Sequence, residues 1–285
     1  MKTQTAYKSD KAREKALASY EETLTQWHVP YENRVVETTF GETYMIVSGA
    51  QEAKPLVLLH GGGGNSTMFI DNVATLSKHF QIYAIDIIGE AGKSAGTRPT
   101  KITEYSIWLK EVFDALGISK AALCGASLGG TFAHQFALTF PQYIDSLILL
   151  APPSLLKMRI SFILRFLLAN MLPTTFFARE FLKYMSSRGS EFPEQSVQAF
   201  VIQVQAYKLN TTKIPIISDY DLAHLPSRTL LLLGEDEVLY DAEKVASRVR
   251  SIAPFVTIAI IAEAKHMVSV DQPDLVNEKI IQFSS

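Results

Sequence analysis

The sequence predicts an α/β fold with a doubly wound, mostly parallel sheet, and three observations predict it. Short apolar runs recur along the chain, each bounded by Gly, Pro, Asn or Asp. Segments of helical length separate these runs, as in consecutive strand-helix-strand units. The runs are continuously apolar rather than alternating, which is typical of parallel strands covered on both faces. With 285 residues, 47% of them hydrophobic, the chain can bury the core of one large domain.

The elements are expected in a regular order along the chain. A charged helix from about residue 9 to residue 27 comes first, and a hairpin around Gly41 follows it. The expected buried strands are Pro55–His60, Gln81–Asp86, Ala121–Gly125, Ser146–Ala151, Thr229–Gly234 and Val256–Ile261. The expected crossover helices are Ser66–His79, Thr103–Leu116, Ser127–Phe140 and Asp241–Ile252.

The strand pattern is interrupted once, between residues 152 and 226. This part contains helix-like stretches and no convincing strand, so a helical cap insertion is expected at 152–226 and a core domain at 1–151 and 227–285. Open α/β folds bind ligands at the carboxyl ends of their strands, and the cap is expected over that edge. Its apolar stretch is interrupted by Lys157, Arg159 and Arg165, which favours an amphipathic helix over a membrane span.

The composition limits the kinds of partner. The formal net charge is −2 and Lys and Arg form no dense run, so a small-molecule partner is expected, with no nucleic acid and no membrane insertion. Cys124 is the one cysteine, which excludes an internal disulfide and a multi-cysteine metal site. No metal and no cofactor is expected. The first residues contain no apolar signal-peptide core, so the expected location is cytoplasmic.

The stretch DIIGEAGKSAG, residues 86–96, contains the tripeptide that ends a phosphate-binding loop. In the P-loop pattern G-x-x-x-x-G-K-[ST], the first glycine lets backbone N–H groups curl around the phosphates. Ile87 occupies that position here, so the pattern is broken at a residue that it needs. The stretch is therefore interpreted as a Gly-rich turn after a strand.

The most specific motif is GASLG, residues 125–129, which fits G-x-S-x-G directly between an expected strand and an expected helix. Small residues on both sides of Ser127 permit the sharp turn that lifts its hydroxyl above the sheet. A serine hydroxyl is a weak nucleophile near neutral pH, so it needs a base, and the base needs an acid that orients it. Ser127 is therefore the candidate nucleophile.

Chain order selects the base. After a G-x-S-x-G serine, the acid follows one late strand and the histidine follows the next. Of the six histidines, only His266 lies between the last strand and the final helix. The stretch EDEVLYD after the preceding strand offers several carboxylates as the acid. The other histidines are interpreted as structural or surface residues, and they are His28, His60, His79, His134 and His224.

The third motif is HGGGG, residues 60–64, which follows the first buried strand. Tetrahedral intermediates of acyl transfer carry an oxyanion. Backbone N–H groups of such a loop, together with the N–H after the nucleophile, can receive it. Glycines between a buried strand and a helix keep side chains out of that space.

Through HGGGG, GASLGG, GEDEV and KHMVSVDQP, the chain resembles the α/β-hydrolase fold family almost from end to end. Among the branches of the family it is most similar to bacterial carboxylesterases with a helical cap. The resemblance implies Ser127 as nucleophile, His266 as base and an acid in the GEDE turn. It also implies an oxyanion hole from the backbone N–H groups of Gly62 and Leu128. DIIGEAGKS resembles the family turn D-x-R-G-x-G-x-S, with one extra residue and Ile88 in place of arginine.

Two carboxylates compete for the role of the acid. In the family the acid usually occupies the fourth position of a G-x-x-D turn, and counting from Gly234 gives Glu237. Aspartate is the commoner acid, which favours Asp236. We predict Glu237, because the position in the turn decides where the side chain points, and Asp236 remains the alternative.

The expected function is hydrolysis of carboxylic esters through an acyl-enzyme on Ser127. Epoxide hydrolases and haloalkane dehalogenases need a carboxylate nucleophile, which the serine argues against. Carbon–carbon bond hydrolases, thioesterases, aminopeptidases and perhydrolases share the expected triad and stay open as alternatives. So does a hydrolase-fold receptor that binds a small molecule with little turnover.

Overall fold

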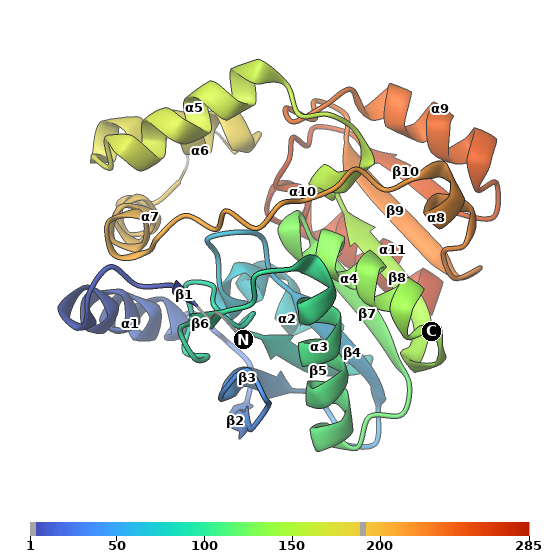
Figure 1. The fold of residues 1–285 in the computed structure, drawn as a ribbon, viewed down its shortest axis with the longest axis horizontal. Helices are drawn as coiled ribbons and strands as arrows, with labels where there is room; N and C mark the ends of the chain where they lie inside the picture. The colour runs from blue at the N-terminus through green and yellow to red at the C-terminus, as the bar shows by residue number, and fades with distance from the viewer. Residues whose placement is uncertain (1–3, 189–191, 285) are drawn as a thin grey trace.

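One eight-stranded sheet organises the protein, and Figure 1 shows it running through the middle of the molecule. The computed structural model describes residues 4–188 and 192–284. The strand order is β10-β9-β8-β7-β4-β5-β3-β2. The β2–β3 and β3–β5 pairs are antiparallel, and the other pairs are parallel. The strands are β2 (Tyr31–Val36), β3 (Thr43–Ser48), β4 (Lys54–Leu59), β5 (Phe80–Ile85), β7 (Ala121–Ala126), β8 (Ile144–Leu150), β9 (Thr229–Gly234) and β10 (Thr257–Ile261).

Helices cover both faces of this sheet, which confirms the doubly wound α/β prediction. On one face α3 (Ile102–Leu116), α4 (Leu128–Thr139) and α9 (Ala242–Ile252) contribute to the core. On the other face the core includes side chains of α1 (Asp10–Leu24), α2 (Ile70–Leu76), α10 (Val268–Asp271) and α11 (Pro273–Ser284). The central strands are buried along their length. This burial on both faces is why their sequences are continuously apolar.

The predicted elements agree with the structure within a few residues at their ends. The helix expected at 66–79 begins as a 3₁₀ turn, η1 (Ser66–Phe69), and its α-helical part ends at Leu76. The first helix begins after Ser9, whose side chain accepts a hydrogen bond from the Ala12 N–H, a local signal for a helix start. The expected hairpin is formed by β2 and β3.

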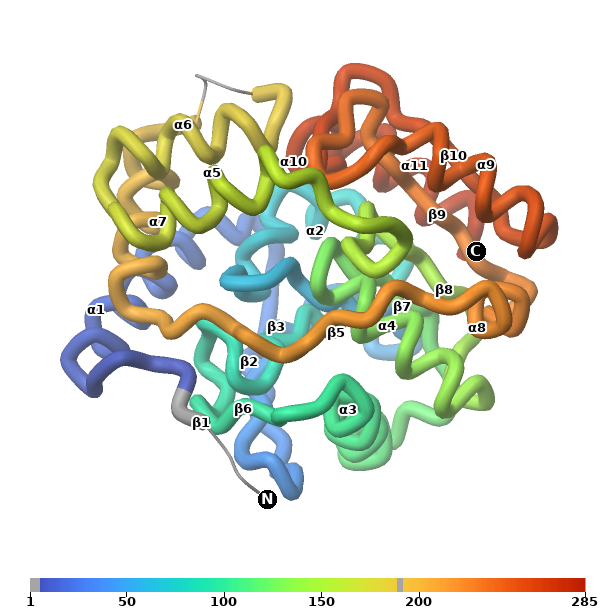
Figure 2. The backbone as a smooth tube through the Cα atoms, turned by 45° about the horizontal axis from the view of Figure 1, so that its top comes forward, coloured from blue at the N-terminus to red at the C-terminus, as the bar shows by residue number. Residues whose placement is uncertain are grey.

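Between β8 and β9 the described residues form helices and no strand. These are η3 (Pro153–Leu155), α5 (Ile160–Met171), α6 (Thr175–Met185), α7 (Glu194–Ala206) and α8 (Asp219–Ala223). Figure 1 shows α5, α6 and α7 grouped to one side of the sheet. In Figure 2 the chain after α7, drawn in orange, crosses the molecule to reach α8. Among the described helices, none is both long and apolar enough to cross a bilayer.

The N-terminal segment holds the end of α7 in place. The short strands β1 (Gln4–Thr5) and β6 (Thr97–Arg98) pair with each other. Just after β1, the Lys8 N–H donates to the carbonyl oxygen of Ala206 at 2.8 Å, and the Lys208 N–H donates to that of Ala6 at 2.7 Å. Figures 1 and 2 both show α1 beside α7. These pairings are not predictable from the sequence, because segments two residues long carry no periodic pattern.

Candidate active site

Ser127 lies on a sharp turn between β7 and α4. Its backbone has φ of 48° and ψ of −117°, a conformation that side-chain-bearing residues rarely adopt. Both flanking glycines are required by close approaches. A Cβ on Gly125 would lie 2.3 Å from the carbonyl oxygen of Gly129, and a Cβ on Gly129 would lie 2.4 Å from that of Leu59. The GASLG motif therefore permits a turn that larger residues would block.

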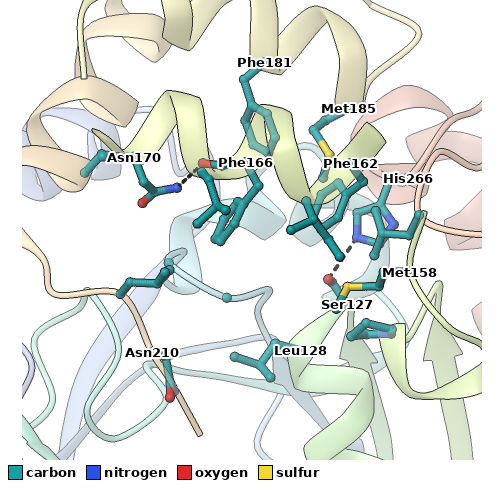
Figure 3. A pocket seen from close by; sticks show the side chains of 18 of the residues that line it. Ser127, Leu128, Met158, Phe162, Phe166, Asn170, Phe181, Met185, Asn210 and His266 are labelled. Atoms are coloured by element: carbon teal, nitrogen blue, oxygen red, sulfur yellow. Dashed lines mark hydrogen bonds between the residues drawn. The ribbon is translucent and has the colours of Figure 1, made fainter. Parts of the chain in front are cut away.

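Ser127, His266 and Glu237 come together although they are far apart in the sequence. The Nε2 atom of His266 lies 2.9 Å from Ser127 Oγ, the contact drawn dashed in Figure 3. The Nδ1 atom of His266 lies 3.0 Å from each carboxylate oxygen of Glu237. The side chains of His266 and Glu237 are 4% and 0% exposed, so water hardly reaches this contact.

These contacts determine which nitrogen of the neutral imidazole carries the proton. An ionised carboxylate only accepts hydrogen bonds, so His266 donates through Nδ1–H to Glu237. Nε2 then has a free lone pair and accepts a hydrogen bond from the Ser127 hydroxyl. The arrangement supplies an acceptor for the serine proton and a negative charge behind the ring that would stabilise an imidazolium.

The turn after β9 aims Glu237, not Asp236, at the histidine. Glu237 is buried, whereas Asp236 is exposed. Gly234 allows the two loops to meet, because a Cβ there would lie 2.0 Å from the carbonyl oxygen of Lys265. The Leu239 N–H also donates to Glu237 Oε1 at 2.8 Å and helps to fix the carboxylate.

The helices between β8 and β9 contact the loops that carry these two residues. The guanidinium of Arg159 donates to the carbonyl oxygen of Glu237 at 2.8 Å, and the hydroxyl of Tyr184 donates to that of Val238 at 3.3 Å. The Met267 N–H, next to His266, donates to the carbonyl oxygen of Met185 at 3.2 Å. Sequence reasoning missed Arg159, which was interpreted only as a charge interrupting an apolar run.

The glycine loop lies beside the serine. A Cβ on Gly61 would lie 3.5 Å from Ser127 Cβ, and a Cβ on Gly62 would lie 3.1 Å from Leu128 Cδ2, so the loop packs against both residues. Leu128 is the first residue of α4, and the first N–H groups of a helix have no partner within the helix. In residues 4–188 and 192–284, neither the Gly62 N–H nor the Leu128 N–H has a hydrogen-bond acceptor. Both residues line the same cavity as Ser127.

His60 holds this loop from behind and takes no part in the Ser127 contacts. Its Nδ1 lies 2.8 Å from the carbonyl oxygen of Gly61, and its Nε2 lies 3.0 Å from the Ile87 nitrogen. Since the Ile87 N–H can only donate, Nε2 accepts and Nδ1–H donates. Burial lowers the pKa of His60, so the neutral ring keeps this bonding pattern.

The remaining histidines lie away from the serine, as expected. His28, His79 and His224 are exposed. His134 is buried within α4, and its Nε2 lies 2.7 Å from Ser154 Oγ. Burial lowers the pKa of His134 to about 4. Neither His134 nor Ser154 lines the cavity that contains Ser127.

A cavity of about 480 Å³ opens at Ser127 and His266 and extends beneath α5 and α6. Figure 3 shows Phe162, Phe166 and Phe181 on the helical side, across from Leu128 and Asn210. The cavity lining is mainly apolar, with amide groups on α5, on α7 and in the segment after α7, where threonine hydroxyl groups also lie. The aromatic lining is Phe162, Phe166, Phe181, Phe200 and Tyr207, and the amides are Asn170, Gln203 and Asn210.

Lys93 of the GKS tripeptide forms hydrogen bonds and an ion pair within the protein. The backbone N–H of Lys93 and the side chain of Ser66 both donate to the buried carboxylate of Asp86. The Lys93 ammonium pairs with Glu21 at 2.8 Å and donates to the Tyr44 hydroxyl at 3.1 Å. These contacts support the interpretation as a structural turn. No group of three or more His, Cys, Asp or Glu side chains in the described part of the chain is arranged to hold a metal ion.

Comparison with known proteins identifies the family. Residues 54–213 match the family model described as the alpha/beta hydrolase fold. The chain belongs to the α/β-hydrolase fold family. It is 34% identical to an uncharacterized carboxylesterase of Bacillus subtilis over 293 residues, which cover 93% of this chain and 90% of the relative. It is 30% identical to carboxylesterase YbfK of the same species over 93% of this chain and 92% of the relative.

Solved structures of this hydrolase family are similar over nearly the whole chain. The naproxen esterase of Bacillus subtilis superposes with a TM-score of 0.90 at 32% identity, covering 97% of this chain and 99% of that structure. The B. subtilis carboxylesterase CesB gives a TM-score of 0.87 at 27% identity, covering 96% and 98%. A meta-cleavage product hydrolase, at 18% identity and a TM-score of 0.75, shares the fold alone. The two B. subtilis relatives that align over 93% of this chain are both named carboxylesterases.

Proposed function

We propose that the protein is a serine carboxylesterase with Ser127 as nucleophile, His266 as general base and Glu237 as the orienting acid. The observation that carries the proposal is the continuous contact from Ser127 Oγ through the imidazole to a buried carboxylate. Similarity to the B. subtilis carboxylesterases supports the same chemistry. We further propose that residues 152–226 form a cap that shapes the substrate site.

In the acylation step, Ser127 Oγ attacks the ester carbonyl carbon while His266 Nε2 takes the hydroxyl proton. The carbon–oxygen bond to the alcohol then breaks, and His266 gives the proton to the departing alcohol. A water molecule next attacks the acyl-enzyme and passes a proton to His266. Cleavage of the bond to Ser127 releases the acid, and the proton returns to the serine, so one ester and one water yield one acid and one alcohol.

The N–H groups of Gly62 and Leu128 are proposed to receive the negative oxygen of each tetrahedral intermediate. They have no acceptor among the described residues, and both residues line the same cavity as Ser127. Donors that are already oriented stabilise the developing charge without reorganisation, and a single such donor contributes about a hundredfold to a thousandfold in kcat.

The substrate is proposed to be an uncharged ester with a bulky apolar group. The cavity beside Ser127 is about 480 Å³ and its helical wall carries several phenyl rings. The rings of Phe162 and Phe166 are stacked with centroids 5.7 Å apart, and both contribute apolar surface to this wall. One similar structure is named a naproxen esterase, and the apolar lining here supports esters with an aromatic or branched group.

Two measurements test the proposal. The purified protein is expected to hydrolyse p-nitrophenyl esters and to be labelled at Ser127 by a fluorophosphonate. Ser127→Ala is expected to abolish labelling, and Ser127→Ala and His266→Ala are each expected to lower kcat on the order of a millionfold while the protein stays folded.

Ser154→Ala is the matched control, because Ser154 also contacts a histidine, His134, at 2.7 Å but is fully buried. It is expected to keep both labelling and turnover. Wild-type protein that is neither labelled nor active, or labelling that persists in Ser127→Ala, would contradict the proposed function.

A further inference from the structure

Glu90, in the DIIGEAGKSAG stretch, is a fully buried carboxylate at the edge of the candidate active site. Its Oε2 accepts a hydrogen bond from the Gly63 N–H at 2.8 Å, and its Oε1 accepts one from Asn210 Nδ2 at 2.6 Å. Gly63 and Asn210 both line the cavity, one from the glycine loop and one from the segment after α7. Glu90 thus joins two walls of the cavity that are far apart in the sequence.

A buried carboxylate requires strong donors, because removal from water disfavours its charge. Within the described part of the chain, Gly63 and Asn210 both donate to Glu90, the Tyr207 hydroxyl also interacts with it, and the Gly63 donor is a backbone N–H of the loop that carries Gly62. The other donor, Asn210, is itself held in place, since its Nδ2 also contacts the Tyr105 hydroxyl at 3.2 Å. Movement of either wall would therefore remove a hydrogen-bond donor from the buried carboxylate.

The Gly63 contact sets the shape of the glycine loop. The Gly64 N–H donates to the carbonyl oxygen of Gly61 at 3.0 Å, which closes a four-residue turn. Gly63 has φ of 67°, as the third residue of a type II turn requires. The alternative turn would reverse the peptide between Gly62 and Gly63 and would point the Gly62 carbonyl oxygen at the Glu90 carboxylate. Repulsion between the two oxygens disfavours that reversal.

We infer that Glu90 is a positioning residue for the oxyanion-binding loop and couples that loop to the cap segment at Asn210. The inference rests on the proposed function, because it concerns how the Gly62 N–H is held for the oxyanion. Glu90 touches no reacting atom. Its role is to keep one loop conformation populated before substrate arrives, so that the donor is oriented in advance.

The test compares Glu90→Gln with Glu111→Gln. Glu111 is a matched control, because its carboxylate also accepts a backbone N–H, that of Thr39 at 2.7 Å, and it does not line the cavity. For each variant, kcat and KM are measured with a p-nitrophenyl ester, and Ki is measured with an alkyl trifluoromethyl ketone. Such ketones form a tetrahedral adduct with an activated serine and place an oxyanion in the hole.

For Glu90→Gln we expect kcat to fall roughly tenfold to a hundredfold and the ketone Ki to rise by the same factor, with KM changed less than about threefold. Glu111→Gln is expected to match wild type within about twofold. A purely structural role would lower the unfolding temperature without this parallel change in kcat and Ki. Unchanged kcat and Ki in Glu90→Gln, or a fall in kcat without a rise in Ki, would overturn the inference.

Asn210→Ala provides a second route if Glu90→Gln does not fold. It removes the cap-side donor and leaves the Gly63 contact in place, so a smaller parallel change in kcat and Ki is expected. No change in either value for Asn210→Ala would overturn the coupling. Wild-type protein that neither hydrolyses the ester nor binds the ketone would contradict the proposed function instead. The two failures are distinct, because the inference about Glu90 is tested only by comparing variants with an active wild type.

Discussion

Replacing Glu237 by glutamine tests the assignment of the acid most directly. In the folded protein the carboxylate receives the Nδ1–H of His266 at 3.0 Å to each oxygen, and Oε1 also accepts the Leu239 N–H at 2.8 Å. Glutamine has nearly the same shape. Its oxygen can keep the Leu239 contact, but its NH₂ group then faces Nδ1 with a second donor.

The expected loss in kcat follows from this geometry. If the amide donates to Nδ1, the ring proton moves to Nε2, and His266 can no longer accept the proton of Ser127. If the proton stays on Nδ1, the negative charge that stabilises the imidazolium is still lost. Comparable changes to serine-hydrolase triads lower kcat about ten-thousandfold to thirty-thousandfold, or about 5.4 to 6.1 kcal/mol.

The assay is turnover of a p-nitrophenyl ester near neutral pH, with the unfolding temperature as a check on the fold. Asp236→Asn is the matched control, because Asp236 is the adjacent carboxylate and is exposed. It should keep turnover within about twofold of wild type. A loss below tenfold in Glu237→Gln, or a collapse in Asp236→Asn, would refute the reasoning.

Three other predictions concern backbone spacing, pH and thiol reactivity. Gly234→Ala should lower kcat at least about a hundredfold. The new Cβ would lie 2.0 Å from the Lys265 carbonyl oxygen and would displace the loop that carries His266. Near-normal turnover in this variant would contradict the prediction. Burial lowers the pKa of His134 to about 4, whereas an unfolded histidine has a pKa of about 6.5. Between these two values the unfolded state binds more protons, so the free energy of unfolding should fall by up to about 3 kcal/mol as the pH is lowered from about 6.5 to about 4. Urea unfolding at pH 7 and pH 5 should show a smaller pH effect in His134→Gln, and an equal effect would exclude His134 as the cause. Burial raises the pKa of the Cys124 thiol to about 12, so a disulfide reagent at pH 8 should react with it only after unfolding, and rapid reaction in native buffer would contradict the buried environment.

The residues that could be predicted from the sequence are those whose type is required by the local backbone geometry or by burial. Ser127 lies in a motif whose glycines face close backbone approaches, and those approaches are present in the structure. Glu237 was expected from its position in a turn, and the structure places it against His266, as the chain order suggested. The strands were predictable because burial on both faces makes their sequences uniformly apolar.

The contacts around these residues were not predictable in the same way. Glu90 and Arg159 are charged residues in or beside apolar segments, and such residues usually face solvent. Their partners, Asn210 and the Glu237 carbonyl, lie 120 and 78 residues away in the sequence. No periodic pattern encodes such a pairing, because it depends on how the helices between β8 and β9 fold back over the sheet.

The hydrogen bonds between the helices that follow β8 and the loops of the candidate active site constrain how this enzyme could be engineered. Side chains that line the cavity without hydrogen-bonding these loops, such as those of Phe162 and Phe166, can be randomised to seek new ester preferences. Arg159 and Tyr184 should be left unchanged in such libraries, since they contact the loop of Glu237. A helical segment grafted from another hydrolase in place of residues 152–226 would have to restore these contacts, or the Glu237 loop would be held less firmly. Diversification by point substitution is therefore the more accessible route to new specificity.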